Sequence, residues 1–284
     1  MKQIAVISGK GGSGKTSLSS SFISLASPCI ICDCDVESPN LHILLQPKKI
    51  NEEAFYGLNK AYINKEKCIE CGLCLESCRF SAIETSYEVL AHKCEGCGVC
   101  SYVCPVGAVE MKQHPAGTYF KSATRYGTMV HAKLGIGEKN SGKLVSLLRK
   151  KAKEAAAKEE MEYIIIDGPP GTGCPVIATL SNVDLAVIVT EPTLSAVHDM
   201  MRVIELCQHF RVKFGVVINK KDLNPEKSEE IKKYCRGKGI PLWGELPFDP
   251  DFRNSIKNLA IPAEYSEKIK TDINSIWYNV IETL

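Results

Sequence analysis

Nine residues near the start of the chain combine the types that hold phosphate: Ser8-Gly9-Lys10-Gly11-Gly12-Ser13-Gly14-Lys15-Thr16. An apolar run, Ile4 to Ile7, precedes them, and Leu18 to Ala26 follows as a predicted helix. A glycine-rich turn in this position lets backbone N–H groups converge on an anion, and the helix dipole adds to their field. The spacing G-x-x-x-x-G-K-T therefore predicts a phosphate site in which Lys15 reaches the outer phosphates and Thr16 binds Mg²⁺. A strand-to-helix turn without a ligand is the alternative.

Two carboxylates follow shortly afterwards, in a stretch that we predict as a short strand from Cys29 to Asp35. Because side chains alternate along a strand, Asp33 and Asp35 are expected on one face and Cys32 and Cys34 on the other. Two carboxylates close to a phosphate site suit the positioning of a metal ion and of water. Two exposed acids that cap a turn are the alternative.

A third carboxylate, Asp167, ends the apolar strand predicted from Glu162 to Ile166 and opens the stretch D-G-P-P-G-T-G. The strand is of the buried parallel kind, and an acid at its carboxyl end suits a Mg²⁺ ligand, direct or through water. Strands and helices alternate around it, which predicts a mostly parallel, doubly wound α/β sheet. The strands are Leu185–Thr190, Phe214–Asn219 and Leu242–Leu246, and the helices are Leu144–Glu160, Leu194–Phe210 and Lys227–Arg236.

A further polar group lies at the carboxyl end of one of these strands, where open α/β sheets bind ligands. The residues Asn219-Lys220-Lys221-Asp222 match N-K-x-D, the base-reading motif of GTPases. We therefore expect Asn219 and Asp222 at the base of a nucleotide. Pro247, just after the last short strand, is assigned to the same end of the site.

Eight of the fourteen cysteines form two copies of C-x-x-C-x-x-C-x-x-x-C, offset by 26 residues without a gap. This is the bacterial ferredoxin run, in which the fourth cysteine of each copy ligates the other cluster. Zinc is the rival metal, but zinc ribbons use paired C-x-x-C. One departure is Arg79, where a proline usually follows the fourth cysteine, and nearby charge can tune a cluster potential. The predicted [4Fe-4S] ligand sets are Cys68, Cys71, Cys74 and Cys104 for one cluster and Cys94, Cys97, Cys100 and Cys78 for the second.

The glycine-rich loop contains a lysine, Lys10, in addition to Lys15. With it the loop resembles the deviant Walker A motif, K-G-G-x-G-K-T, of the MinD/Mrp/ParA group and of the nitrogenase iron protein. The stretch D-G-P-P-G-T-G is similar to the switch II of Mrp-like iron-sulfur carriers, and the D-x-D pattern of Asp33 and Asp35 to switch I. The resemblance implies that Lys10 crosses a dimer interface to the partner's nucleotide. It also implies that Asp35 orients the attacking water, that Asp33 supports the magnesium shell and that Asn219 reads adenine, so that ATP is favoured while GTP stays open.

Together these features resemble a MinD/Mrp superfamily P-loop ATPase with an inserted two-cluster ferredoxin domain. We expect the ATPase domain at 1–60 and 113–284 and the α+β insert at 61–112. The catalytic residues expected are Lys10, Lys15, Asp35 and Asp167, with Mg²⁺ held by Thr16 and Asp167. The nucleotide contacts expected are Gly9, Lys10, Gly11, Gly12, Ser13, Gly14, Lys15, Thr16, Ser17, Asn219, Asp222 and Pro247.

The predicted function is Mg²⁺-dependent, dimer-activated ATP hydrolysis that gates electron transfer or metallocofactor handling toward a partner protein. The expected cofactors are ATP, Mg²⁺ and two [4Fe-4S] clusters. One alternative is a cluster scaffold or carrier in which nucleotide only sets the conformation. The hypothesis of a MinD-like positioning ATPase is less well supported, because it leaves the eight cysteines unexplained.

Composition and charge bear on two further questions, whether the protein binds nucleic acid and whether it inserts in a membrane. A net charge of +2 over 284 residues argues neither for nor against a nucleic-acid partner, because steering needs a concentrated basic patch. The basic clusters at 149–151 and 232–233 are interpreted as solvated helix faces, so no nucleic-acid partner is expected. No apolar run approaches the roughly 18 residues that span a bilayer, and the N-terminus lacks a signal-peptide layout, which predicts a cytoplasmic protein. The last helix, Ser266 to Leu284, has an apolar face with a polar face of mixed charge, so we expect it to dock on the protein's own core rather than insert in a membrane.

Cys174 follows Asp167 by seven residues, an offset that resembles the cluster-ligating cysteine of the nitrogenase iron protein. No second ligand of that kind is evident. A buried, inert cysteine is therefore favoured, because free cysteine often behaves as a small hydrophobe.

Overall fold

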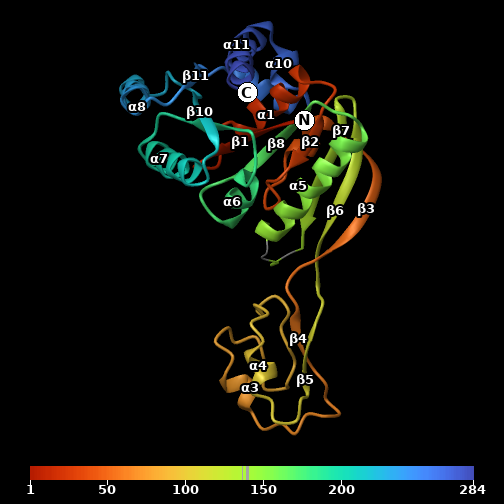
Figure 1. Ribbon diagram of the computed structural model, residues 1–284. Coiled ribbons are helices and arrows are strands. Elements are labelled where there is room, and N and C mark those ends of the chain that lie inside the picture. The colour runs from red at the N-terminus through yellow and green to blue at the C-terminus, as the bar shows by residue number, and fades with distance from the viewer. Residues whose placement is uncertain (136, 139–140) are drawn as a thin grey trace. The chain divides into compact units, whose positions relative to one another are not determined.

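The computed structural model describes residues 1–135, 137–138 and 141–284 of the chain. It consists of two compact units (Figure 1). The larger comprises Met1–Glu52, Tyr119–Lys133 and Ser141–Leu284, and the smaller comprises Glu53–Thr118 and Leu134–Asn140. The smaller unit thus extends to both sides of the expected insert 61–112 and also recruits a segment near residue 138.

A nine-stranded sheet forms the centre of the larger unit, in the order β11-β10-β9-β1-β8-β2-β7-β6-β3. The pairs β10–β11, β9–β10, β1–β9, β1–β8, β2–β8 and β2–β7 are parallel, which confirms the predicted mostly parallel α/β sheet. The strands are β1 (Lys2–Ser8), β2 (Ile30–Asp33), β3 (Lys48–Tyr56), β6 (Pro115–Thr124), β7 (Gly127–Leu134), β8 (Tyr163–Pro170), β9 (Leu185–Thr190), β10 (Lys213–Ile218) and β11 (Leu242–Glu245).

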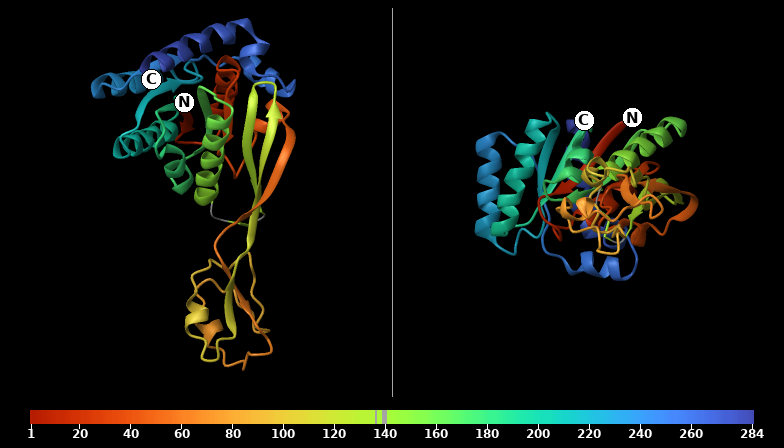
Figure 2. Two further views of the ribbon diagram at one scale, coloured as in Figure 1. Left: turned by 45° about the vertical axis from the view of Figure 1, so that its right-hand side comes forward. Right: turned by 90° about the horizontal axis from the view of Figure 1, so that it is seen from below.

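Helices cover both faces of this sheet (Figure 2). On one face α1, α10 and α11 pack together, and on the other α5 packs against α6. Central strands buried on both faces must be apolar throughout, and β9 has no exposed residue. The helices are α1 (Lys15–Leu25), α2 (Leu41–Leu45), α5 (Ser141–Lys158), α6 (Cys174–Leu180), α7 (Leu194–His209), α8 (Pro225–Lys238), α9 (Pro250–Lys257), α10 (Pro262–Tyr265) and α11 (Glu267–Thr283).

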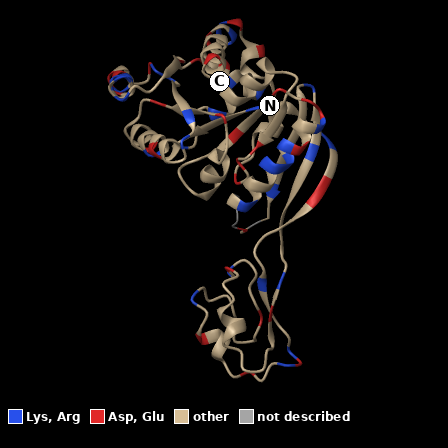
Figure 3. Cartoon of the chain, in the orientation of Figure 1, with Lys and Arg blue, Asp and Glu red and all other residues tan. Residues whose placement is uncertain are grey.

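The C-terminal helix α11 docks on the core of its own unit, as predicted, and it carries both acidic and basic residues (Figure 3). Ile269, Ile273, Ile276 and Val280 are buried in the same apolar cluster as α1. The Trp277 ring lies 5.0 Å from the ring of Phe22, between centroids. In the described part of the chain, no helix combines the length and apolar character needed to cross a membrane.

The strand after the first helix is shorter than predicted, because β2 ends at Asp33. The predicted bounds, residues 29–35, are therefore wrong, because the backbone turns after Asp33 and the N–H of Asp35 donates to Oδ1 of Asp33 at 3.1 Å. The predicted sides are confirmed: the Sγ atoms of Cys32 and Cys34 lie 3.5 Å apart, whereas Asp33 and Asp35 both lie close enough to Lys15 to raise its pKa. The backbone N–H of Cys34 donates to the carbonyl of Asp167, at 2.8 Å. The carboxyl ends of β2 and β8 are thereby tied together.

The smaller unit contains two structurally similar halves, which correspond to the two copies of the cysteine spacing. Helices α3 (Leu73–Glu76) and α4 (Val99–Tyr102) occupy equivalent positions in the two copies, each preceded by a glycine with positive φ. Strands β4 (Lys60–Ile63) and β5 (Val109–Lys112) pair in antiparallel fashion and bring Ile63 opposite Val109. The equivalent residues of the other copies, Val89 and Ile83, form an isolated antiparallel bridge.

Three segments of the smaller unit are joined by the buried carboxylate of Glu138. Its Oε1 atom accepts from Lys60 Nζ at 2.5 Å and lies 3.2 Å from His114 Nε2. The Nζ of Lys60 also donates to the carbonyl of Ala91, at 2.7 Å. These contacts explain why residues beyond 61–112 belong to this unit.

Candidate functional site

The glycine-rich loop runs from the end of β1 to the start of α1, and its glycines have separate structural causes. Gly12 and Gly14 have φ of 81° and 90°, a backbone region that side chains disfavour. A Cβ atom on Gly14 would lie 2.1 Å from Nδ2 of Asn219, and one on Gly9 would lie 2.6 Å from the backbone of Asp199. The loop therefore has its shape because α7 and the end of β10 approach it closely.

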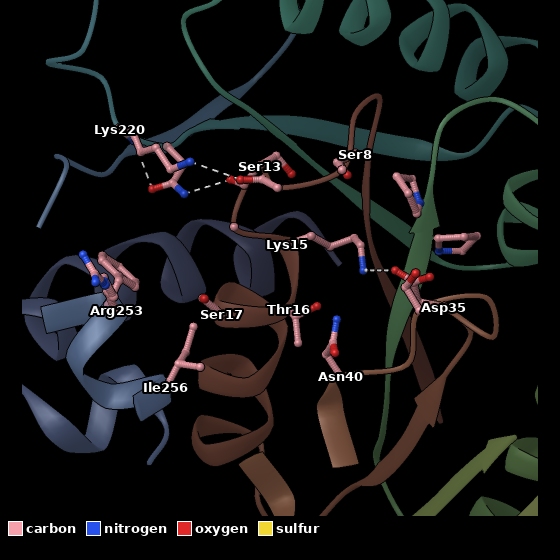
Figure 4. Close-up of a pocket in the computed structure, with 18 of the residues that line it drawn as sticks. Ser8, Ser13, Lys15, Thr16, Ser17, Asp35, Asn40, Lys220, Arg253 and Ile256 are labelled. Atoms are coloured by element: carbon pink, nitrogen blue, oxygen red, sulfur yellow. Dashed lines mark hydrogen bonds and ion pairs between the residues drawn. The ribbon is translucent and has the colours of Figure 1, made fainter. Parts of the chain in front are cut away.

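The side chains after the loop converge on Asp167 at the end of β8. Lys15 Nζ donates to its Oδ1 atom at 2.9 Å, and Thr16 Oγ1 donates to its Oδ2 atom at 2.9 Å. Ser19 Oγ adds a bond of 2.8 Å to Oδ1. Lys15 Nζ also lies 3.4 Å from Oδ2 of Asp35, a contact visible in Figure 4. The loop lysine and threonine thus share one center with the two predicted switch carboxylates.

Burial and charge strongly perturb this center. Burial raises the pKa of Asp33, and the carboxylate of Asp167 raises it further. Burial alone lowers the pKa of Lys15, but the carboxylates of Asp167 and Asp35 outweigh it, so that the net pKa is raised. Burial also raises the pKa of Asp35. Three carboxyl groups face one lysine here, and a bound cation would offset the carboxylate charge that the lysine does not balance.

The observation that best fits a divalent cation is an orphaned oxygen. Oδ2 of Asp33 is buried and has no hydrogen-bond partner among the described residues. Such groups are rare in native proteins and call for an ion or water. Carboxylate and hydroxyl oxygens are the ligands that Mg²⁺ prefers, and Asp167 and Thr16 supply both types. The residues present therefore fit a magnesium ion.

A cavity of about 1090 Å³ opens beside this center. The predicted nucleotide contacts that line it are Gly11, Gly12, Ser13, Gly14, Lys15, Thr16, Ser17, Asn219 and Pro247, together with Asp35. Gly9, Lys10 and Asp222 do not belong to the described residues that line it. The loop, the ends of three strands and α9 contribute to one pocket (Figure 4).

Asn219 lines the pocket and also contacts the glycine-rich loop. Its Nδ2 atom donates to the carbonyl of Ser13 at 2.8 Å. The next residue, Lys220, donates from Nζ to the carbonyl of Gly12 at 3.1 Å and to Oε2 of Glu191 at 3.0 Å. Asp222 has a different task, because its Oδ1 atom accepts the backbone N–H of Phe248 at 2.6 Å. Asp222 therefore fixes the segment after β11 rather than facing the cavity.

Lys10 points away from the pocket of its own chain. Its Nζ atom lies 3.3 Å from Ser195 Oγ and 3.7 Å from Glu191 Oε1, and 44% of its side chain is exposed. Sequence reasoning missed Glu191, because it follows β9 without a recognisable motif.

Several other lining residues were also missed. They come from the turn after Asp35, from the segment between β11 and α9, and from α9 itself, and they are Asn40, Phe248, Phe252, Arg253, Ile256 and Lys257. The available signal was positional: α9 begins directly after the last parallel strand, at the ligand-binding edge of the sheet.

In the smaller unit, each predicted set of four cysteines lines one small cavity. Cys68, Cys71, Cys74 and Cys104 surround the first, together with Ile69, Leu73, Tyr87 and Val106. Cys94, Cys97, Cys100 and Cys78 surround the second, together with Phe80 and Val99. The fourth cysteine of each copy thus lies with the first three of the other copy.

The chemistry of these two cavities fits iron-sulfur clusters. Within the described ranges, no three His, Cys, Asp or Glu side chains converge on a site for a single metal ion. Four thiols around an apolar cavity suit the larger [4Fe-4S] group, whose irons each take one cysteine. The backbone N–H groups of Ala108 and Ala82 donate to Cys104 and Cys78, at 3.3 and 3.4 Å. Burial raises the pKa of the Cys104 thiol, but backbone N–H groups, that of Ala108 first, outweigh it, so that the net pKa is lowered.

Cys174 is exposed, so the prediction that it is buried is wrong. It is the first residue of α6, which buries Val176, Thr179 and Leu180 instead. Its position at the helix start turns the side chain away from the core.

A mostly parallel sheet with a glycine-rich loop after β1, a buried carboxylate on β8 and a cavity beside them defines a P-loop nucleotide-binding protein. The sequence matches the CobQ/CobB/MinD/ParA nucleotide binding domain over residues 4–261, and the chain belongs to this family.

Known proteins resemble the chain over different extents. Uncharacterized protein MJ0578 of Methanocaldococcus jannaschii is 35% identical over 285 residues, covering 99% of this chain and 96% of that protein. The cytosolic Fe-S cluster assembly factor NUBP2 homolog of Nematostella vectensis is 30% identical over 114 residues, which are 35% of this chain and 42% of that protein. The crystal structure of the cell division ATPase MinD of Pyrococcus furiosus superposes with a TM-score of 0.59 at 16% identity, covering 100% and 99% of the two chains.

Proposed function

We propose that the chain is a Mg²⁺-dependent ATPase that acts as a cytoplasmic homodimer and couples its nucleotide state to two [4Fe-4S] clusters for a redox or metallocofactor partner protein. The observation that carries the proposal is a conjunction within one chain. A P-loop pocket with buried carboxylates occurs together with two cavities that are each lined by four cysteines.

The hydrolytic part follows from the side chains around the pocket. Loop N–H groups and Lys15 bind the phosphates, and Thr16 with Asp167 holds the metal ion. Asp35, 3.4 Å from Lys15, orients the attacking water, and the orphaned oxygen of Asp33 supports the metal shell. Asn219 reads the base at the other end of the cavity, which favours ATP.

The homodimer follows from Lys10. The lysine lies outside its own pocket and is partly exposed, so it is free to reach a second copy of the chain. There it stabilises charge on the transferring phosphoryl group, a role worth roughly 10³ to 10⁵ in rate for comparable trans-acting cations.

The iron-sulfur part follows from the smaller unit. Its two cysteine sets hold the clusters, which when bound supply one-electron transfer. The smaller unit lies in the sequence between Asp35 and Asp167, so a continuous backbone joins it to both carboxylate segments. This connectivity supports coupling between the nucleotide pocket and the clusters.

The decisive experiment combines hydrolysis with electron paramagnetic resonance of the reduced protein. We expect Mg²⁺-dependent ATP hydrolysis that falls at least a hundred-fold in Lys15→Ala, and a cluster signal or potential that changes when an ATP analogue binds. Cluster content should be equal in the two proteins. Undiminished turnover in Lys15→Ala contradicts the ATPase, and a signal indifferent to nucleotide contradicts the coupling.

A second candidate is a cluster scaffold or carrier in which nucleotide only sets the conformation. The partial similarity to cytosolic Fe-S cluster assembly factors favours it. Transfer of intact cluster to an apo-protein, without redox cycling of the donor, would identify this function instead.

A further inference from the structure

We infer that Glu191 is a positioning residue for Lys10: it holds this lysine on its own subunit and releases it to a second copy of the chain. The inference rests on the proposed dimeric ATPase and adds a residue that regulates assembly of the site. Glu191 directly follows β9 and is buried, with 9% of its surface exposed.

The carboxylate of Glu191 contacts two lysines, Lys10 of the glycine-rich loop and Lys220, which follows β10. Its Oε1 atom lies 3.7 Å from Lys10 Nζ, whereas its Oε2 atom lies 3.0 Å from Lys220 Nζ. Only the second distance is that of a good hydrogen bond. Lys220 is held further by the carbonyl of Gly12, at 3.1 Å. Lys220 is thus the fixed partner and Lys10 the exchangeable one.

The second lysine makes the release of the first inexpensive. A buried carboxylate that loses its only partner becomes an uncompensated charge, which is strongly destabilising. Glu191 keeps Lys220 when Lys10 leaves, so its charge stays balanced. A pair with a solvent-exposed lysine is also weak, because water competes for the ammonium group.

The surroundings of Lys10 keep its backbone in place during this exchange. The loop at Gly9 packs directly on α7, where an added Cβ would meet the backbone of Asp199 at 2.6 Å. Ser195, in the first turn of α7, contacts Lys10 Nζ at 3.3 Å. The Lys10 side chain therefore moves between Glu191 and a phosphate oxygen of the nucleotide bound to the second copy. The phosphates carry more negative charge than Glu191, so they compete successfully for the lysine.

The test is Glu191→Gln, which keeps the shape and removes the charge. At saturating Mg-ATP and low protein concentration we expect hydrolysis per chain to rise about two- to five-fold, because a weak ion pair no longer opposes assembly. At high protein concentration the rate should equal that of the unchanged chain. Sedimentation with an ATP analogue should show dimers forming at lower protein concentration.

Two further variants separate this role from a structural one. Glu191→Gln should give no increase in a Lys10→Ala background, because the effect acts through Lys10. Glu245→Gln is the matched control, since Glu245 also contacts two lysines, Lys232 at 2.9 Å and Lys221 at 3.8 Å. It should leave the concentration dependence unchanged.

An unchanged or lower rate in Glu191→Gln overturns the inference, and so does an increase that persists without Lys10. Neither result touches the proposed function, provided that the unchanged chain hydrolyses ATP. If that chain does not hydrolyse ATP while its analogue-induced dimer is normal, the proposed ATPase fails and sedimentation alone decides the role of Glu191.

Discussion

The nucleotide pocket and the cysteine cavities are built by opposite strategies. The pocket gathers residues from the loop after β1, from switch I, from the end of β10 and from α9, positions as far apart as Ser13 and Lys257. The eight cysteines of the two cavities lie within fewer than 40 consecutive residues, Cys68 to Cys104, and come from two copies of one spacing. A site assembled across a sheet depends on the whole core, whereas a site assembled from local repeats depends on ligand spacing.

The two regions also differ in what stabilises them. The larger unit buries entire apolar strands such as β9. The core of the smaller unit is a short set in which cysteines take the place of larger hydrophobic residues: Ala61, Ile63, Cys74, Ile83, Cys100 and Val109. Small units with so little apolar core commonly need metal ligation to fold. Four changes to the chain test how independent the two regions are.

The largest expected effect is loss of cluster iron. Cys71→Ser removes one of the four thiols of the first cavity, so the iron and acid-labile sulfide per chain should fall by about half. Nucleotide affinity, measured by calorimetry, should not change. Cys174→Ser is the control and should retain all of its iron. Full iron in Cys71→Ser would contradict the ligand assignment, and loss of nucleotide binding would contradict the independence of the two regions.

A backbone change should affect the pocket alone. Gly14→Ala introduces a side chain at φ of 90° and 2.1 Å from Nδ2 of Asn219. We expect the free energy of unfolding of the larger unit to fall by about 1–3 kcal/mol and nucleotide affinity to fall more than ten-fold.

The control for this change lies in the same loop. At Gly11 no described heavy atom lies within 4 Å of an added Cβ, so Gly11→Ala should cost less than about 0.5 kcal/mol. Denaturation followed by tryptophan fluorescence reports on the larger unit, because Trp243 and Trp277 both lie there. Equal losses in the two variants would show that close packing on Asn219 is unimportant.

Acid should weaken the larger unit through His131 on β7. Burial lowers the pKa of His131 to about 4, with a smaller contribution from His42. Neutral His131 therefore stabilises the fold above its unfolded pKa near 6.5, and this contribution is lost as the pH falls toward 4. After allowance for partial solvation, the loss should be about 1–2 kcal/mol. His131→Gln should show a shallower fall in unfolding free energy between these pH values, and an identical slope would contradict the assignment.

The smallest effect is expected at Asp222. Its hydrogen bond to the N–H of Phe248 shapes the pocket wall, so Asp222→Ala should weaken nucleotide binding by about two- to ten-fold. The weakening should be equal for ADP and GDP, because the carboxylate does not face the cavity. Calorimetric titration with both nucleotides makes the comparison. A loss confined to GDP would restore Asp222 as a base-reading residue.

Much of the framework could be predicted without coordinates. The strand Leu185–Thr190 has the predicted bounds, and the helix from Glu267 docks on the core by its predicted face. These predictions succeed because apolar periodicity reflects burial directly. The predicted bounds of the second strand were wrong, because a local turn, in which the N–H of Asp35 donates to the side chain of Asp33, ends β2 at Asp33.

By itself, the sequence determined the chemistry available: a phosphate loop, three carboxylates after strands, and eight cysteines in two equal copies. Spacing along the chain is sufficient for such local motifs, because their geometry is set by the turn or helix that contains them. Only the tertiary structure decided which groups meet. It brought α9 to the pocket, and it placed Asp222 against Phe248, 26 positions away, and Lys10 beside Glu191, 181 positions away. The distance between residues so far apart in the sequence depends on the packing of the whole sheet.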